Sequence, residues 1–206
     1  MAGTNLTALA LVCTLTPSPA PSSSELLAQR ILAQLLSHSV SGDLLRIADY
    51  DVKPGVQHNM GPGDQWPGIR DRILAADILV LVTPIWLGHP CSLAQRVLER
   101  LDADLSATDP EGRPVMYGKV AIVGVVGNED GAHKVTADLY QGLNDVGFTV
   151  PAQGGTYWVG QAMQTTDYKD FDSDPEETAR ATAFAARNAA HLGAILKNNP
   201  YPAEEE

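Results

Sequence analysis

Five apolar runs alternate with helix patterns along this chain, and the alternation limits the possible folds more than any other feature. The runs span residues 6–13, 43–49, 77–83, 119–126 and 148–152, and they are rich in Val, Ile and Leu. Near-continuous apolar runs are typical of strands that are covered on both faces, as in a parallel sheet. Five strand–helix repeats therefore predict a doubly wound α/β fold with helices on both sides of one sheet.

Start and stop signals for helices lie between the apolar runs. Ser22 and Glu25 have the spacing of a capping box, and Gly42 is expected to end the helix that follows. Asp130 is expected to cap a later helix. The five expected helices cover residues 22–42, 66–76, 92–105, 130–147 and 174–197.

Three long irregular stretches interrupt the alternation, at residues 49–65, 105–118 and 154–172. Loops of this length inside a domain are usually functional or disordered. No change of composition marks a domain boundary. We therefore expect a single domain over residues 1–206, in which about 199–206 form a flexible tail.

Charge and composition exclude several functions. The chain has 14 Lys and Arg against 25 Asp and Glu, a net charge of −11, which disfavours binding to nucleic acid or anionic lipid. No apolar run is long enough for a membrane span, and no basic residue precedes the first run, which therefore predicts a strand and not a secretion signal. Cys13 and Cys91 are expected in the core, and the histidines lack metal-ligand spacing. A cytoplasmic location fits two free cysteines.

The first candidate ligand loop follows the first apolar run. Ligands of open α/β sheets bind beyond the carboxyl ends of the strands. Residues 14–24 lie there, are rich in hydroxyls, carry no charge and lead into a helix start. Hydroxyls, backbone N–H groups and the helix dipole suit a phosphate monoester. The alternative is a surface turn in which Ser22 only caps the helix.

Two further loops are expected at the same edge of the sheet. Residues 83–92 expose apolar side chains around Trp86, which suggests a flat ring held against them; a dimer contact or a core position of Trp86 is the alternative. Residues 126–133 offer polar groups and turn-forming glycines, unless Asp130 only caps a helix. The three loops thus suit a phosphate, a flat ring and a polar ring edge. A mononucleotide with a flat heterocycle has these three parts, and FMN fits this shape.

The chain resembles the flavodoxin-like NAD(P)H-dependent FMN reductases and oxidoreductases over about residues 6–197. The loop leading into SSSELLAQRIL, the stretch TPIWLGHPCSLAQRVLERLD and the stretch GNEDGAHKVTADLYQGLNDVGFTVP carry the resemblance. It implies a flavodoxin-like three-layer α/β/α sandwich with a five-stranded parallel sheet in the order 2-1-3-4-5. By position, it implies FMN-phosphate contacts at Thr14, Thr16, Ser18, Ser22, Ser23 and Ser24, isoalloxazine contacts at Pro84, Ile85, Trp86, Leu87 and Gly88, and polar-edge contacts at Gly127, Asn128, Glu129, Asp130 and Gly131.

The function implied by the resemblance is that of an FMN-dependent oxidoreductase. A hydride passes from NAD(P)H through FMN to a flavin, quinone or other small-molecule acceptor, and no side chain is assigned as a catalytic acid or base. The alternative is a flavodoxin-type electron carrier without nicotinamide turnover, which the acidity of the chain favours, whereas the long loops favour an enzyme. A homodimer or homotetramer is compatible with this fold, because one copy leaves a face of the flavin open.

Aromatic side chains in the last irregular stretch leave three interpretations open. Tyr157, Trp158 and Tyr168 could cover the flavin, pack against a partner subunit or form a small satellite core.

Overall fold

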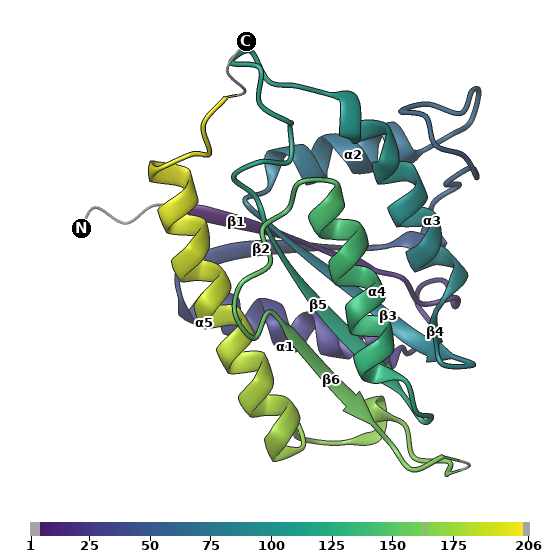
Figure 1. Ribbon diagram of the computed structural model, residues 1–206. Helices are drawn as coiled ribbons and strands as arrows, with labels where there is room; N and C mark the ends of the chain where they lie inside the picture. The colour runs from purple at the N-terminus through teal and green to yellow at the C-terminus, as the bar shows by residue number, and fades with distance from the viewer. Residues whose placement is uncertain (1–4, 163, 204–206) are drawn as a thin grey trace.

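A five-stranded parallel sheet lies between two layers of helices in the computed structural model, which describes residues 5–162 and 164–203 (Figure 1). The strands are β1 (Leu6–Val12), β2 (Val40–Arg46), β3 (Ile78–Trp86), β5 (Val120–Gly127) and β6 (Gly155–Val159), and the two-residue β4 (His89–Pro90) pairs antiparallel with β3. The α-helices are α1 (Ser23–Ser37), α2 (Trp66–Ala75), α3 (Ser92–Leu101), α4 (Ala132–Asp145) and α5 (Glu176–Asn198). Short 3-10 helices are η1 (Ile47–Asp49), η2 (Asp102–Ser106) and η3 (Tyr168–Asp170).

The strand order is β2-β1-β3-β5-β6. Without the short β4, this is the predicted order, and the three-layer α/β/α fold is confirmed. The sheet differs from the prediction by one added strand. None of the described helices is long and apolar enough to cross a lipid bilayer.

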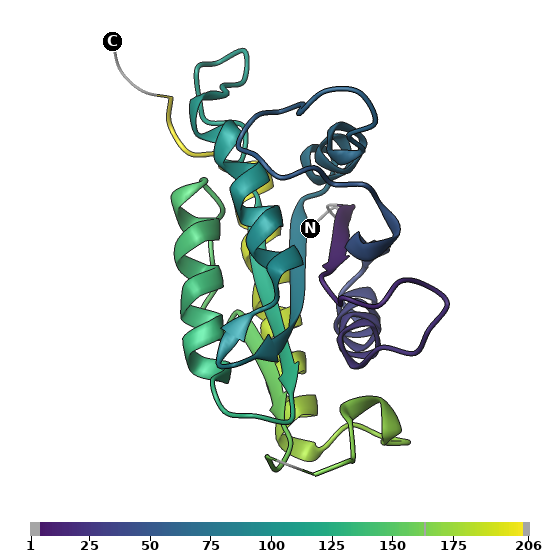
Figure 2. The same cartoon turned by 90° about the vertical axis from the view of Figure 1, so that its right-hand side faces the viewer.

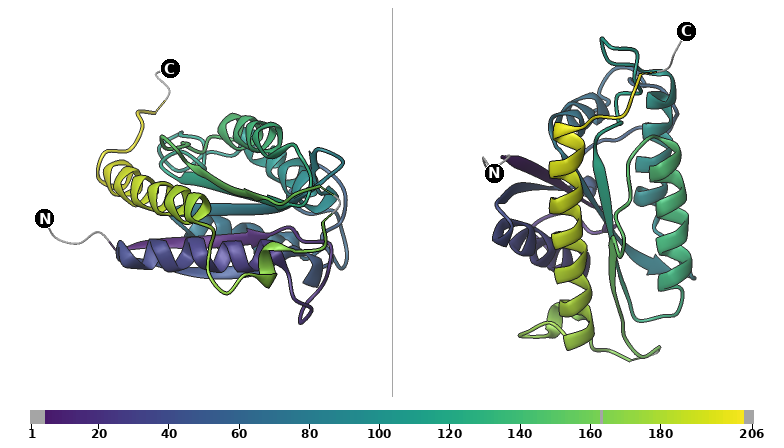
Figure 3. Two further views of the ribbon diagram at one scale, coloured as in Figure 1. Left: turned by 90° about the horizontal axis from the view of Figure 1, so that it is seen from below. Right: turned by 60° about the vertical axis from the view of Figure 1, so that its left-hand side comes forward.

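Two hydrophobic cores lie on the two faces of the sheet. In β1, Leu9 and Leu11 belong to the core under α2, α3 and α4, whereas Ala8 and Ala10 belong to the core under α1 and α5. Successive side chains of a strand point to opposite faces, so a strand buried on both sides needs apolar residues at every position. Figure 3 shows the two helical layers that create this requirement.

The last strand was predicted in the wrong place. Residues 148–152 are not a strand: Thr149 makes one isolated bridge with Val120, and Pro151 has no N–H with which to continue pairing. Strand β6 instead lies within the stretch 154–172, which was predicted to be irregular. The run of Thr, Tyr, Trp and Val in β6 has the β-branched and aromatic composition that could have indicated it.

Two predicted helix signals also differ from the structure. Helix α1 ends at Ser37, and Gly42 lies inside β2 and does not end the helix. The N-cap of α4 is Gly131 and not Asp130, whose carboxylate accepts a hydrogen bond from the Gly131 N–H at 2.7 Å. Both differences move an element boundary without changing the order of the elements.

Strand β3 continues beyond the predicted end at residue 83 and turns back into β4. Leu87 and Gly88 form the turn, with φ angles of 53° and 72°. Positive φ at both central residues is the requirement of a two-residue type I′ hairpin turn. The hairpin carries Trp86 past the sheet edge. In Figure 2 this hairpin, the loop after β1 and the chain after β6 lie at the same end of the molecule.

Candidate functional site

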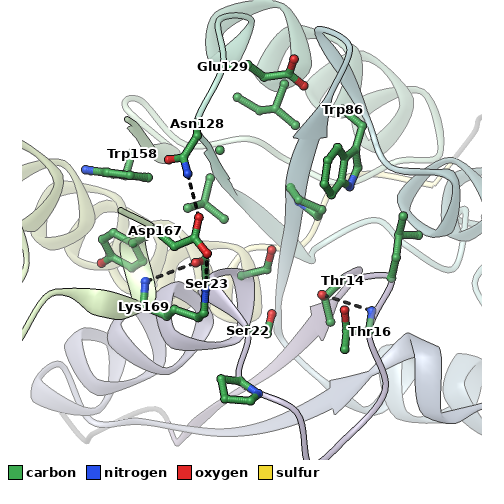
Figure 4. A pocket seen from close by; sticks show the side chains of 18 of the residues that line it. Thr14, Thr16, Ser22, Ser23, Trp86, Asn128, Glu129, Trp158, Asp167 and Lys169 are labelled. Carbon is green, nitrogen blue, oxygen red and sulfur yellow. Dashed lines mark hydrogen bonds and ion pairs between the residues drawn. The ribbon is translucent and has the colours of Figure 1, made fainter. Parts of the chain in front are cut away.

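A cavity of about 610 Å³ lies at the carboxyl ends of β1, β3 and β5 (Figure 4). Pockets for small molecules usually have volumes of about 300–1,000 Å³. The three predicted loops form part of the wall, and β6 with the chain after it forms the rest. The lining residues are Thr14, Leu15, Thr16, Pro21, Ser22, Ser23, Ser24, Pro84, Ile85, Trp86, Leu87, Val126, Gly127, Asn128, Glu129, Trp158, Ala162, Asp167, Tyr168 and Lys169.

One end of the cavity is the start of α1. Ser22 is the N-cap, and its Oγ accepts a hydrogen bond from the Glu25 N–H at 3.3 Å. Ser23 and Ser24 follow in the first turn, where backbone N–H groups have no partner within the helix. Hydroxyls and free N–H groups at the positive end of the helix dipole make this end suitable for an anion.

Arg46 anchors the loop before α1 without lining the cavity. Its Nη1 donates hydrogen bonds to the carbonyls of Thr16 at 3.2 Å and Ala20 at 2.8 Å. Its guanidinium also forms an ion pair with Glu25. Arg46 is buried and does not line the cavity, so its guanidinium stabilises the conformation of the loop.

Ser18 was predicted to contact the phosphate, but the structure places it outside the cavity. Its backbone N–H and its Oγ both donate hydrogen bonds to the carboxylate of Asp49, each at 2.7 Å. The hydrogen bond from the Ser18 side chain, followed by that from its backbone, lowers the pKa of Asp49. Ser18 therefore anchors the loop to η1.

The second wall of the cavity is the end of β3. Trp86 lines the cavity and has 57% of its surface exposed, so it lies outside the hydrophobic core, as expected. Ile85 is buried beneath it, and Leu87 is 88% exposed at the tip of the hairpin. The side chains therefore present an apolar face, with one large aromatic ring, to the cavity.

The third wall carries polar side chains from the end of β5. The Asn128 amide donates a hydrogen bond to Asp167 Oδ1 at 2.7 Å. The buried atoms Asn128 Oδ1 and Glu129 Oε1 have no hydrogen-bond partner in the described part of the chain. Buried acceptors normally find donors, because leaving one unpaired costs about 1–3 kcal/mol. A ligand with N–H donors would fit this wall.

Three residues predicted for the polar edge or the ring line a different cavity. Gly88, Asp130 and Gly131 lie around a second cavity of about 690 Å³ at the start of α4. Gly131 has a φ of 121°, and a Cβ there would come within 2.9 Å of the Gly88 Cα. The backbones of Gly131 and Gly88 thus lie close together, and none of the three residues lines the first cavity.

The fourth wall lies outside the three predicted loops; Trp158 and Tyr168 were among the aromatic side chains that could cover the flavin, whereas Asp167 and Lys169 were not expected here. Strand β6 contributes Trp158, and the chain after it contributes Asp167, Tyr168 and Lys169. The rings of Trp158 and Tyr168 pack against each other, with centroids 5.7 Å apart. The two side chains therefore form a small aromatic cluster and also line the cavity. Tyr157 points elsewhere and lies 3.1 Å from His133 Nε2. The aromatic residues were the available signal, and contact with a partner subunit stays one of the open alternatives for Tyr157.

The two cysteines and the possible metal ligands were also located in the structure. Cys13 and Cys91 are both buried, as expected, and burial raises the pKa of the Cys13 thiol well above its usual value. Across residues 5–162 and 164–203, no group of three or more His, Cys, Asp or Glu side chains is placed to hold a metal ion. Among the lining residues that the structure describes, the charged side chains of the first cavity are those of Glu129, Asp167 and Lys169.

Fold and site together define a flavodoxin-like α/β protein with a ligand cavity at the carboxyl ends of its strands. The model of the family NADPH-dependent FMN reductase matches residues 8–164, and the chain belongs to this family. FMN and NAD(P)H are the cofactors that the family implies. A short-chain flavodoxin, 17% identical, has the same fold with a TM-score of 0.58 over 91% of this chain and 99% of its own.

Two relatives and one solved structure are similar over most of this chain. The 8-demethyl-8-aminoriboflavin-5'-phosphate synthase of Streptomyces davaonensis is 30% identical over 98% of this chain and 82% of its own length. RosB with the bound intermediate 8-demethyl-8-formylriboflavin-5'-phosphate has a TM-score of 0.84 at 30% identity, over 95% of this chain and 82% of its own. The divalent metal cation transporter MntH of Mycobacterium bovis is 35% identical over 93% of this chain, which spans only 29% of that protein.

Proposed function

We propose that the first cavity binds FMN and that the protein passes a hydride from NAD(P)H through FMN to a small-molecule acceptor. One observation carries the proposal. A single cavity combines a helix start rich in hydroxyls, an exposed tryptophan and unpaired buried acceptors. These are the three surroundings that a phosphate, a flat ring and a ring edge with an N–H donor require.

The phosphate of FMN would lie at the start of α1. Ser22 and Ser23 line the cavity there, with Thr14 and Thr16 on the preceding loop. Thr14 Oγ1 and the Thr16 N–H lie 3.5 Å apart, so this internal contact is weak and both groups are available to a ligand. Hydrogen bonds to a charged partner contribute about 1.5–3 kcal/mol each.

The ring would lie between the end of β3 and the end of β5. Trp86 and Ile85 provide apolar surface on one side. Asn128 and Glu129 line this side of the cavity and would lie beside the polar pyrimidine edge of the ring. This arrangement orients the ring by its polar edge and keeps water from the face that Trp86 covers.

FMN, when bound, supplies the chemistry of accepting a hydride and releasing electrons to an acceptor. The side chains of the cavity bind and orient, and none is proposed as an acid or a base. Flavins, quinones and other small molecules are the acceptor classes that we propose.

Anaerobic mixing with reduced nicotinamide tests the proposal. The FMN-loaded protein is mixed with NADH or with NADPH in a stopped-flow instrument, and the flavin absorbance is followed. We expect bleaching within seconds with at least one of the two nucleotides. No bleaching after minutes with either would favour the electron carrier, which accepts electrons only from a reductase protein.

A second candidate function treats FMN as the substrate. The synthase from Streptomyces davaonensis forms a product in which an amino group replaces the 8-methyl group of the flavin, and RosB holds an 8-formyl intermediate. The 30% identity over almost the whole chain and the TM-score of 0.84 favour a related modification here. Mass spectrometry of the flavin after aerobic incubation, with and without amine donors, would detect it. Unchanged FMN under all conditions would reject this candidate.

A further inference from the structure

We propose that Lys169 is the counter-charge for the phosphate of FMN and that it sets the preference for phosphorylated over unphosphorylated flavin. This inference rests on the proposed FMN site. It adds a binding residue from η3, outside the three loops that the sequence indicated.

The charges of the cavity create the need for such a residue. A phosphate monoester carries a charge of about −1.5 to −2 at neutral pH. Glu129 and Asp167 line the cavity with carboxylates, and the chain has a net charge of −11. Among the described lining residues, Lys169 has the one cationic side chain. Without it, the phosphate would enter a cavity with only acidic charged groups.

The backbone of η3 places Lys169 at the phosphate end. The Lys169 N–H donates a hydrogen bond to Ser23 Oγ at 3.2 Å, across 146 positions of sequence. Ser23 is the first residue of α1, so the lysine lies beside the helix start (Figure 4). A substitution of the Lys169 side chain leaves this backbone hydrogen bond in place.

Asp167 holds the ammonium group of Lys169 at the cavity. The two side chains form an ion pair, and Asp167 also accepts the hydrogen bond from Asn128. Asp167 is fixed further by a capping box with Asp170 at the start of η3. Since an ammonium group has three donors, Lys169 can bind a phosphate oxygen without leaving Asp167.

Arg46 is the other cation near the loop, and its contacts exclude it from this role. Its guanidinium is bonded to two backbone carbonyls and paired with Glu25. It is buried and is absent from the cavity wall. Lys169, by contrast, is exposed and has a single ion-pair partner in the described structure.

Flavin titrations of matched variants test the inference. FMN and riboflavin are titrated into the apo forms of the full-length protein, Lys169→Gln, Lys169→Arg and Arg180→Gln. Arg180 is an exposed cation of α5 paired with Glu177, so its loss changes the net charge equally. We expect Lys169→Gln to weaken FMN by about tenfold, a conservative value for one partly exposed charge-assisted hydrogen bond, and to leave riboflavin within about twofold. Lys169→Arg and Arg180→Gln should bind FMN nearly as the parent protein does.

The outcomes separate this inference from the proposed function. If the parent protein binds FMN and riboflavin equally, the phosphate site itself is wrong. If the parent prefers FMN and Lys169→Gln keeps the whole preference, only the role of Lys169 is overturned. Unchanged riboflavin affinity shows that the variant is folded. Raised salt should weaken FMN binding less in Lys169→Gln than in the parent protein, because one exposed charge is missing.

Discussion

Ser18 ties the loop after β1 to η1 through two hydrogen bonds to one carboxylate, that of Asp49. Arg46 ties the same loop to α1 through Glu25. The loop that would surround the phosphate is thus fixed on both sides before any ligand binds. A preformed loop lowers the ordering cost of binding.

The Asp49 anchor predicts a pH-dependent stability. The pKa of Asp49 is lowered in the folded protein, so its contribution is present above the unfolded pKa of about 4 and is lost as the pH falls below it. Asp49→Asn should lower the thermal midpoint at pH 7, and the difference from the parent should shrink toward pH 3. Asp172→Asn, which changes another exposed carboxylate, is the control. A difference that stays constant with pH would contradict the prediction.

The helix start predicts strong discrimination between flavins. Riboflavin lacks the phosphate, and each charge-assisted hydrogen bond contributes about 1.5–3 kcal/mol. Loss of two or more should weaken riboflavin binding at least about a hundredfold relative to FMN. Quenching of flavin fluorescence measures both affinities. Equal affinities would remove the basis for a phosphate at Ser22 and Ser23.

Substitutions of Trp86 and Trp66 are expected to have opposite effects, the first on FMN affinity and the second on stability. Trp86 is mostly exposed at the cavity, and Trp66 is fully buried in α2. Trp86→Ala should weaken FMN about tenfold, for a loss near 1.4 kcal/mol, with little change in the apo thermal midpoint. Trp66→Ala should cost about 3–5 kcal/mol of stability. If Trp86→Ala destabilises the apo protein and leaves FMN affinity unchanged, the ring lies elsewhere.

The long loop before α2 depends on a buried ion pair. Arg100 donates hydrogen bonds to Asp64 and to the carbonyls of Lys53 and Gln57, each at 2.8 Å. Burial raises the pKa of Asp64, but hydrogen bonds from Arg100 and three backbone N–H groups outweigh it and hold the pKa well below its usual range.

Arg100→Met should therefore lower the free energy of unfolding by about 3–5 kcal/mol, because it leaves the Asp64 carboxylate buried without its partner. Urea unfolding measures the loss. The double variant Arg100→Met/Asp64→Asn should recover part of it, since no unpaired charge then remains and an amide oxygen still accepts from backbone N–H groups. Full additivity of the two single changes would show that the pair does not act as a unit.

The inner strands could be predicted because each is buried on both faces, whereas their order followed from the family resemblance. Such strands leave unbroken apolar runs, as in β1 and β5. The edge strand β6 has no such run, because Thr156 is its one fully buried residue. Phe148 is apolar and buried but lies outside the strands, so the apolar pattern there indicated the core and not the sheet.

The cavity could be predicted in part. Three of its walls follow directly from strand ends, and their positions in the chain indicate where they meet. Asp167 and Lys169 reach the cavity only through contacts with Asn128 and Ser23, which are far away in sequence. Such contacts leave no periodic pattern in one sequence. Ser18 was misplaced for a related reason, because its partner Asp49 belongs to another loop.

The chain between β6 and α5, called the cassette here, is held between two elements that contact each other. Thr156 of β6 is bonded to Thr182 Oγ1 at 2.9 Å and to the Thr178 carbonyl at 3.3 Å, both in α5. The two ends of the cassette are thus clamped together inside the protein, while the residues between them reach the cavity. Grafting a cassette of another length or charge would alter the ligand chosen and leave the sheet intact. Diversification of ligand choice within this scaffold therefore needs few changes outside one short segment.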